Sequence, residues 1–147
     1  MFDGDRRGTG LKHDESYLRI ADEVASRSYC KRNMVGAVLV KDKSIIAEGY
    51  NGTPYGRPNV CECADGKTKD EVVHAEENAI LKVARSSQSC NGATLYLTLS
   101  PCIRCARLIV QAGIKRVIYR DQYRNIDGLE LLSKCGVYHE QLLRPIR

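Results

Sequence analysis

The stretch that decides the fold is "ATLYLTLSPCIRCARLIVQAGIKRVIYR", residues 93–120. It begins and ends with apolar runs of strand length, "ATLYLTL" (93–99) and "IKRVIYR" (114–120). The residues between these runs are typical of a helix over 102–112. The stretch therefore predicts strand, helix and strand in succession.

The helix between the two strands has clear start and stop signals. Ser100 and Pro101 are typical of an N-cap and a first helical turn. Gly113 is typical of the residue that ends a helix.

The rest of the chain contains the same two kinds of element. The sequence predicts, in order, a helix over 16–27, strands over 35–40 and 44–50 joined by the turn "KDK", helices over 74–85 and 126–135, and a short last strand within 136–140. This order predicts an α/β layered domain with a mixed sheet. We expect a single domain over residues 1–147, in which residues 1–12 form a loose lead-in rich in glycine and charge.

Length and composition limit the class of protein. A chain of 147 residues buries roughly 70% of its unfolded surface, so it needs no disulfide to fold. No apolar run approaches the roughly 18 residues that span a bilayer, and the first residues lack the apolar core of a signal peptide. We therefore expect a cytoplasmic protein with no membrane partner. The net charge of +5 suits an anionic ligand.

Seven cysteines are unusual in such a chain: Cys30, Cys61, Cys63, Cys90, Cys102, Cys105 and Cys135. Their odd number excludes a complete set of disulfides. Without a secretion signal, close cysteine pairs favour metal binding or catalysis over disulfides. Cys90 and Cys135 are interpreted as small buried or free thiols.

Cys102 and Cys105 lie three residues apart, so they share one face of the predicted helix. Both fall in its first turn, where free N–H groups and the helix dipole stabilise thiolates. His74, at the start of its own helix, is the candidate third ligand, because thiolate and imidazole together are what zinc prefers. Three protein ligands leave one position for water, which is the catalytic arrangement.

Glu76 is the candidate general acid and base. It follows His74 by two residues, and residues two apart do not face the same side of a helix, so Glu76 is a poor fourth ligand. At the mouth of the helix it can instead approach the open metal position, take a proton from the water and pass it to a substrate.

Each of these motifs is ambiguous when taken alone. A His-x-Glu sequence often occurs by chance, and "PCIRC" (101–105) also fits a thioredoxin-like redox pair or half of a structural zinc site. A structural site needs a fourth protein ligand, which neither flank of the motif supplies. A non-catalytic zinc module would not need a carboxylate at position 76. The joint pattern H-x-E…P-C-x-x-C is the signature of zinc deaminases.

From this pattern outward the chain resembles the cytidine deaminase-like superfamily, and within it the deoxycytidylate (dCMP) deaminases, over roughly residues 14–140. The resemblance is carried by "SYCKRNMVGAVLVKD", "IIAEGYNGTPYG", "VVHAEENAIL", "GATLYLTLSPCIRCARLIVQAGIKRVIY" and "YRDQY". It implies a three-layer fold in which a central mixed five-stranded sheet is flanked by helices.

The resemblance also implies the reaction and its residues. His74, Cys102 and Cys105 would hold one Zn²⁺, and Glu76 would shuttle protons. In this family hydroxide attacks C4 of the cytosine of dCMP, ammonia leaves, and the product dUMP supplies thymidylate synthesis.

Three further residues match substrate-binding positions of the family. Asn51, in the turn "YNG", matches the Asn that contacts the sugar, and Arg32 and Tyr123 match positions that meet the 5′-phosphate. A guanidinium and a phenol are good donors to phosphate oxygens. On the residues alone, Arg32 also fits a solvated charge, and Tyr123 fits an ordinary core or surface tyrosine.

Many members of the family are oligomers, commonly hexamers, that dCTP activates and dTTP inhibits. The regulatory triphosphate binds with Mg²⁺ at a site involving the loop after the second strand, and "GYNGTPYG" (49–56) matches that region. The resemblance therefore implies a homo-oligomer, with a hexamer favoured, and regulation by dCTP and dTTP.

Some members carry a second, structural zinc, with ligands near the position of Cys30 and in the loop before the H-A-E helix. Cys30, Cys61 and Cys63 are the candidates here. The segment from Cys63 to the H-A-E motif contains no further His or Cys to complete four ligands, and Asp65 or Asp70 would be less typical.

The closest rivals keep the chemistry and change the substrate: deaminases of free cytidine or guanine, or of adenosine in tRNA. Enzymes that edit nucleic acid need a dense basic surface and a channel for flanking nucleotides. The charge of this chain is spread through both halves, with no basic run beyond "KR" or "RR" pairs. We therefore expect no nucleic-acid partner.

Overall fold

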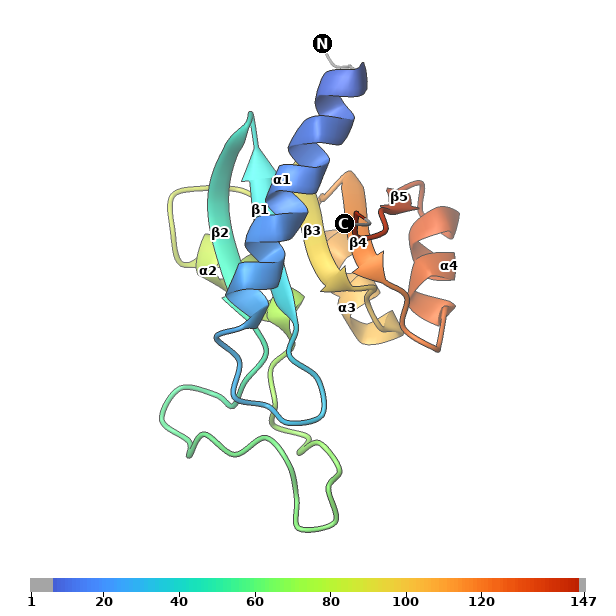
Figure 1. The fold of residues 1–147 in the computed structure, drawn as a ribbon. Coiled ribbons are helices and arrows are strands. Elements are labelled where there is room, and N and C mark those ends of the chain that lie inside the picture. The colour runs from blue at the N-terminus through green and yellow to red at the C-terminus, as the bar shows by residue number, and fades with distance from the viewer. Residues whose placement is uncertain (1–6, 146–147) are drawn as a thin grey trace.

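The computed structural model describes residues 7–145, which form one five-stranded sheet with helices on both faces (Figure 1). In chain order the elements are α1 (Arg7–Ala25), β1 (Gly36–Lys41), β2 (Ser44–Tyr50), α2 (Ala75–Ala84), β3 (Thr94–Leu99), α3 (Ile103–Gln111), β4 (Arg116–Asp121), α4 (Asp127–Lys134) and β5 (Tyr138–Gln141). The predicted α/β fold, with a central mixed five-stranded sheet flanked by helices, is confirmed.

The order of strands across the sheet is β2-β1-β3-β4-β5. Strand β1 is antiparallel to both β2 and β3, whereas β3, β4 and β5 run parallel to one another. The two parallel connections pass through α3 and α4, because parallel neighbours need a long crossover, which a helix usually supplies.

Two hydrophobic cores lie on opposite faces of this sheet, since successive side chains of a strand point to opposite sides. Val38, Tyr96 and Ile118 are paired across β1, β3 and β4, and they belong to the core against α1. The adjacent pair Leu39 and Leu95 belongs to the core against α2, α3 and α4. Figure 1 shows the resulting layers, with α1 crossing one face, α2 and α3 behind the sheet, and α4 beside β5.

The predicted start of the first helix was wrong. Helix α1 begins at Arg7 and not at Ser16, so residues 7–12 are helical and do not form a loose lead-in; residues 1–6 lie outside the described part of the chain. Once its packed turns have formed, each further helical residue gains one hydrogen bond for the one residue that is fixed, so extending a helix is much easier than starting one. No helix within residues 7–145 is long and apolar enough to cross a membrane.

The predicted N-cap of α3 was also wrong, because the cap is Cys102 and not Ser100. The N–H of Ser100 donates to the carbonyl of Asp121 (2.9 Å), which continues the pairing of β3 with β4. The hydroxyl of Ser100 accepts a hydrogen bond from the N–H of Tyr123 (2.7 Å). Ser100 is therefore bound to the strand next to it, and the helix begins two positions later.

One edge of the sheet gathers the ends of several elements. The carboxyl ends of β2, β3 and β4 lie at this edge together with the start of β1, because β1 is antiparallel to its two neighbours. The long loop 51–73 hangs from the same edge (Figure 1). In open α/β sheets, ligands bind outside the carboxyl ends of the strands, so this edge is where a site is expected.

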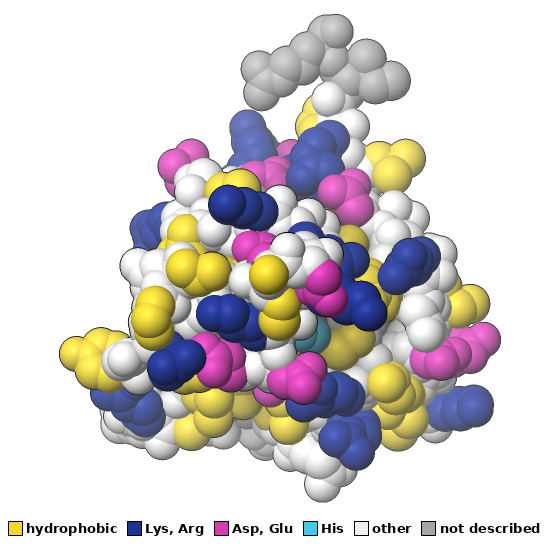
Figure 2. Space-filling view, turned by 90° about the horizontal axis from the view of Figure 1, so that it is seen from below, with side chains coloured by type: hydrophobic (Ala, Val, Ile, Leu, Met, Phe, Trp, Pro, Cys, Tyr) yellow, Lys and Arg dark blue, Asp and Glu magenta, His cyan; other side chains and the backbone are white. Residues whose placement is uncertain are grey.

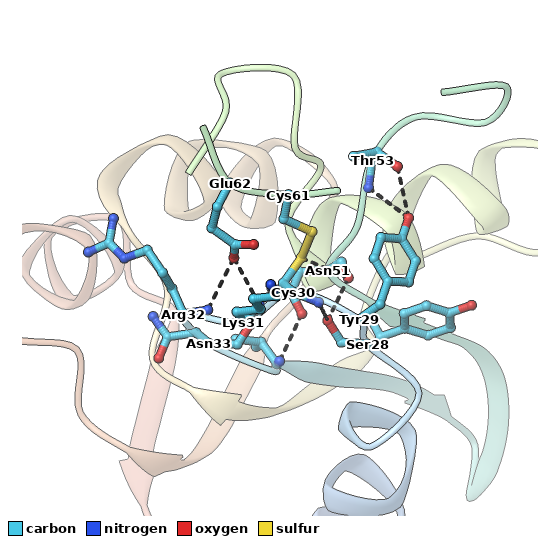
Figure 3. The surroundings of a disulfide bond; sticks show 12 residues. Ser28, Tyr29, Cys30, Lys31, Arg32, Asn33, Asn51, Thr53, Cys61 and Glu62 are labelled. Carbon is cyan, nitrogen blue, oxygen red and sulfur yellow. Dashed lines mark hydrogen bonds between the residues drawn. A yellow bond between two sulfur atoms is a disulfide. The ribbon is translucent and has the colours of Figure 1, made fainter. Parts of the chain in front are cut away.

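A disulfide, Cys30–Cys61, ties the long loop to the segment between α1 and β1 (Figure 3). Cys63 is exposed and free, as is Cys135, whereas Cys90 is a buried free thiol. The candidate second zinc site on Cys30, Cys61 and Cys63 is therefore not formed in this structure, because sulfurs joined in a disulfide are not thiolate ligands. The sequence argument against disulfides applied to cysteines that are close in the chain. Cys30 and Cys61 are 31 positions apart, and only folding brings them together.

Arg120 is buried in the sheet and is only 1% exposed. Its guanidinium donates two hydrogen bonds, of 2.8 and 2.7 Å, to the carboxylate of Glu15 on α1. This bond lowers the pKa of Glu15. A buried charge is tolerated only when it is paired, so the two residues fasten α1 to the end of β4, the strand that leads to the site edge.

Replacing Glu15 with Gln is expected to lower the free energy of unfolding by about 2 kcal/mol, because Arg120 would remain buried without its full counter-charge. The lowered pKa of Glu15 means that its contribution is complete above the unfolded value, near 4.5, and is lost as the pH falls through the folded value. Urea unfolding at pH 7 and at acidic pH should show the two proteins converging in acid. Glu23→Gln, on an exposed position of the same helix, should change stability by less than about 0.5 kcal/mol; an equal loss in both variants would contradict the role of the pair.

Counting reactive thiols tests the disulfide. Unfolded without reductant and with a chelator present, the protein is expected to take up five equivalents of iodoacetamide. After reduction it should take up seven, one for each cysteine. Peptide mass spectrometry should find Cys30 and Cys61 unmodified only in the first sample. Seven modified cysteines in both samples would show that the bond is absent.

Candidate active site

Two helices begin side by side at the site edge, and their first residues carry the predicted metal ligands. His74 is the N-cap of α2, Cys102 is the N-cap of α3, and Cys105 follows in the first turn of α3. The Nδ1 of His74 lies 3.2 Å from the Sγ of Cys105 and 3.7 Å from the Sγ of Cys102. The structure therefore brings the three predicted ligands together.

This cluster fits a zinc ion. Its imidazole nitrogen and two sulfurs all lie within 4.8 Å of one another. Ligands of a tetrahedral zinc, at about 2.0–2.3 Å from the metal, stand roughly 3.5 Å apart, which matches these separations. Within residues 7–145 the cluster has these three members and no fourth His, Cys, Asp or Glu. The donor set is therefore that of a catalytic and not of a closed structural site.

Close backbone contacts hold the two helix starts in place. The N–H of His74 donates to the carboxylate of Glu77 (2.9 Å), which is half of a capping box. A Cβ at Gly49 on β2 would lie 2.5 Å from the first carbonyl oxygen of α2, and a Cβ at Gly128 on α4 would lie 2.2 Å from the carbonyl of Pro101. Both glycines allow a neighbouring element to approach closer than any side chain would permit.

The surroundings give the two sulfurs opposite proton affinities. A hydrogen bond from Cys105 lowers the pKa of Cys102 to about 3, and the bond to His74 acts in the same direction. The hydrogen bond to Cys102, together with burial, raises the pKa of Cys105. The bond to Cys102 also raises the pKa of His74. Hydrogen bonds link these three groups, and a bound metal would displace the shared protons. The affinity of the cluster for a metal is therefore expected to depend on pH.

Glu76 lies in the first turn of α2 and is 4% exposed. Burial raises the pKa of its carboxyl group to about 7. A carboxyl group that titrates near neutrality can accept and donate a proton in the same reaction. Glu76 lines the same cavity as His74 and Cys102, so the predicted acid and base lies beside the predicted metal ligands.

The cavity at this edge has a volume of about 550 Å³, which is within the range of small-molecule sites. Its walls come from the segment before β1, the long loop, the starts of α2 and α3, and the segment after β4. All three predicted substrate residues, Arg32, Asn51 and Tyr123, line it. Figure 2 shows this end of the molecule, where Lys and Arg side chains alternate with Asp and Glu around a partly covered histidine.

Asn51 is engaged with the protein itself. Its Oδ1 accepts a hydrogen bond from the N–H of Val35 (2.9 Å), and its Nδ2 donates to the carbonyl of Asn33 (2.8 Å). An amide side chain has two donor hydrogens and two acceptor lone pairs, so one of each remains. The predicted contact with a sugar therefore stays a prediction, alongside a clear role in holding the segment before β1.

Several polar residues of the cavity wall were not singled out from the sequence, among them Glu62, Gln122 and Arg124. Gln122 and Arg124 flank Tyr123, and a segment that follows a strand at its carboxyl end is a signal that could have found them. Glu62 had no such signal, because its place depends on how the long loop folds back.

Comparison with known sequences agrees with this geometry. The model of the "Cytidine and deoxycytidylate deaminase zinc-binding region" family matches residues 11–121. A deoxycytidylate deaminase of Mycobacterium phage D29 is 42% identical over 120 residues, which cover 72% of this chain and 92% of the phage protein. A deoxycytidylate deaminase of Schizosaccharomyces pombe is 39% identical over 90% of this chain, but this chain spans only 44% of the yeast protein.

Comparison with solved structures gives the same result. The crystal structure of dCMP deaminase from the cyanophage S-TIM5, in complex with dCMP and dUMP, matches with a TM-score of 0.88 and 45% identity. The match covers 93% of this chain and 100% of the cyanophage chain. Since the family model covers most of the chain, including His74, Cys102 and Cys105, this protein belongs to the cytidine and deoxycytidylate deaminase family of zinc-binding enzymes.

Proposed function

We propose that the protein hydrolyses dCMP to dUMP and ammonia. The observation that carries the proposal is that one cavity is lined both by Glu76, next to the His74–Cys102–Cys105 cluster, and by the basic side chain of Arg32. The similarity to a structure that holds both dCMP and dUMP supports this substrate and product.

The residues of the site divide the reaction between them. Zinc held by His74, Cys102 and Cys105 would lower the pKa of water to about 7 and so supply a nucleophile at neutral pH. Glu76 takes a proton from the attacking water on a carboxylate oxygen and passes it to N3 of cytosine, while a C–O bond forms at C4. The remaining proton of that water, now on the C4 hydroxyl, is carried by the same carboxyl group to the amino nitrogen. The C4–N bond then breaks, so dCMP and water become dUMP and ammonia.

Arg32 and Tyr123 select a substrate that carries a phosphate. Arg32 approaches the cavity from the segment before β1, and Tyr123 approaches it from the segment after β4. A guanidinium and a phenol form charge-assisted hydrogen bonds with phosphate oxygens. The N–H of Tyr123 is bound to the buried Ser100, so its backbone is fixed next to the start of α3. The remaining amide donor of Asn51 suits the hydroxyl of the deoxyribose.

The same proposal extends to regulation and assembly. The product would supply thymidylate synthesis, with dCTP as activator and dTTP as inhibitor, each bound with Mg²⁺. Homo-oligomers, with a hexamer favoured, would be the active form. These parts follow from the family resemblance, and assays with triphosphates and measurement of the molecular mass test them directly.

dCMP is expected to have a kcat/KM at least about 100-fold above that of deoxycytidine, because only the nucleotide offers a phosphate to Arg32 and Tyr123. Ammonia release from dCMP, deoxycytidine, guanine and a tRNA anticodon stem measures this. Adding dCTP or dTTP with Mg²⁺ to the dCMP assay shows whether either regulates the enzyme. Equal turnover of dCMP and deoxycytidine would contradict the role of Arg32.

Glu76→Gln is expected to reduce kcat by at least about 100-fold while zinc content stays at one per chain, because the amide cannot carry the proton. Zinc analysis and steady-state assays on the same preparation check both parts. Glu130→Gln, at an exposed position on α4, serves as the control and should retain native activity. Unchanged turnover in Glu76→Gln would exclude this residue as the proton carrier.

A further inference from the structure

Residues 28–35, in the segment between α1 and β1, form no helix or strand of their own. We call these residues the Arg32 turn, because they include Arg32, whose exposed side chain lines the cavity. A guanidinium on irregular backbone meets a ligand in a constant geometry only if other parts of the molecule hold that backbone. The contacts of the Arg32 turn therefore determine how well it can bind an anion.

Glu62 holds this turn at Arg32 itself. One carboxylate oxygen, Oε2, accepts a hydrogen bond from the N–H of Lys31 (2.8 Å) and another from the N–H of Arg32 (3.1 Å). Figure 3 shows both bonds, with the guanidinium of Arg32 extending away from them. Hydrogen bonds to an ionised carboxylate are about twice as strong as neutral ones. Because Glu62 bonds to backbone N–H groups and not to the guanidinium, the side chain of Arg32 stays available to a ligand.

Glu62 is itself held on a small support within the long loop. It pairs with Thr68 in an antiparallel bridge, and the carbonyl of Cys61 accepts a hydrogen bond from the N–H of Lys69 (2.7 Å). The disulfide joins Cys30 to Cys61, the residues just before Lys31 and Glu62. The disulfide and the carboxylate therefore fasten the same two segments at adjacent positions.

The other end of the Arg32 turn is held independently. The amide of Asn51 bonds both the carbonyl of Asn33 and the N–H of Val35. Asn51 therefore holds residues that follow Arg32, whereas Glu62 holds Arg32 and the residue before it. Removing Glu62 would therefore free Arg32 without releasing the start of β1.

We propose that Glu62 is a positioning residue for phosphate recognition. Its carboxylate fixes the backbone at Arg32, so that the guanidinium meets the 5′-phosphate of a nucleoside monophosphate. The inference rests on the proposed function and deepens it. Because the bonds of Glu62 go to the backbone of Arg32, Glu62 acts on the affinity for the phosphate and not on the proton transfers at Glu76.

The test compares Glu62→Ala, Glu62→Asp and Glu62→Gln with dCMP and with deoxycytidine. Ala removes the acceptor, and Asp keeps the charge but is one methylene too short, so both should raise KM for dCMP by about tenfold or more with kcat little changed. Gln keeps a carbonyl acceptor and should recover most of the loss. The kcat/KM for deoxycytidine should change less than about twofold in all three variants, because deoxycytidine has no phosphate that could contact Arg32. Glu71→Ala is the matched control, since that carboxylate on the same loop pairs with Arg57 instead.

A double-mutant cycle with Arg32→Ala separates this inference from the proposed function. If Glu62 acts through Arg32, adding Glu62→Ala to Arg32→Ala should raise KM for dCMP by less than about twofold. An Arg32→Ala protein that still prefers dCMP as strongly as the native enzyme overturns the phosphate role and Glu62 with it. If Arg32→Ala loses that preference but Glu62→Ala and Glu62→Asp keep it, only the role of Glu62 is overturned. Equal losses with dCMP and deoxycytidine would likewise show that Glu62 is merely structural.

Discussion

The meeting of two helix starts at one edge of the sheet is the constraint on which the site depends. Each residue along an α-helix turns its side chain by about 100°, so starting α2 or α3 one residue earlier or later would point a ligand away from the cluster. The close approaches at Gly49 and Gly128 set these positions, because backbone packs directly on backbone there. Free N–H groups at both helix starts also favour the thiolates and the carboxylate that gather at this point.

The two sides of the cavity are built in different ways. The metal side comes from regular elements: His74 and Cys102 cap helices, and Glu76 lies in a helical turn. The side that carries Arg32 is irregular backbone, which has no hydrogen-bond ladder of its own and is held by side chains such as Asn51 and Glu62. Regular elements fix the first side through their own hydrogen bonds, whereas the second side depends on contacts with distant side chains to hold its backbone.

The disulfide fastens a long loop that has little hydrophobic core of its own. Cys30, Cys61 and Val72 form a small cluster apart from the two main cores, with Tyr29 packed against it. So few buried side chains cannot hold a loop of this length by hydrophobic burial alone. Closing a loop of 31 residues by a disulfide contributes about 3–4 kcal/mol in the chain-entropy account.

The sequence by itself determined the fold class, the order of the elements and the three residues of the metal cluster. Strand and helix periodicities depend on neighbours in the chain. The same holds for the two motifs of the site, because His74 lies two residues from Glu76 and Cys102 lies three residues from Cys105. Only the tertiary structure decided which distant groups meet. The pairing of Cys30 with Cys61, the bond from Glu15 to Arg120 and the place of Glu62 all join parts of the chain that no local pattern relates. Such contacts depend on the path of the whole backbone, because a loop or a sheet edge acquires its neighbours only after the layers have packed.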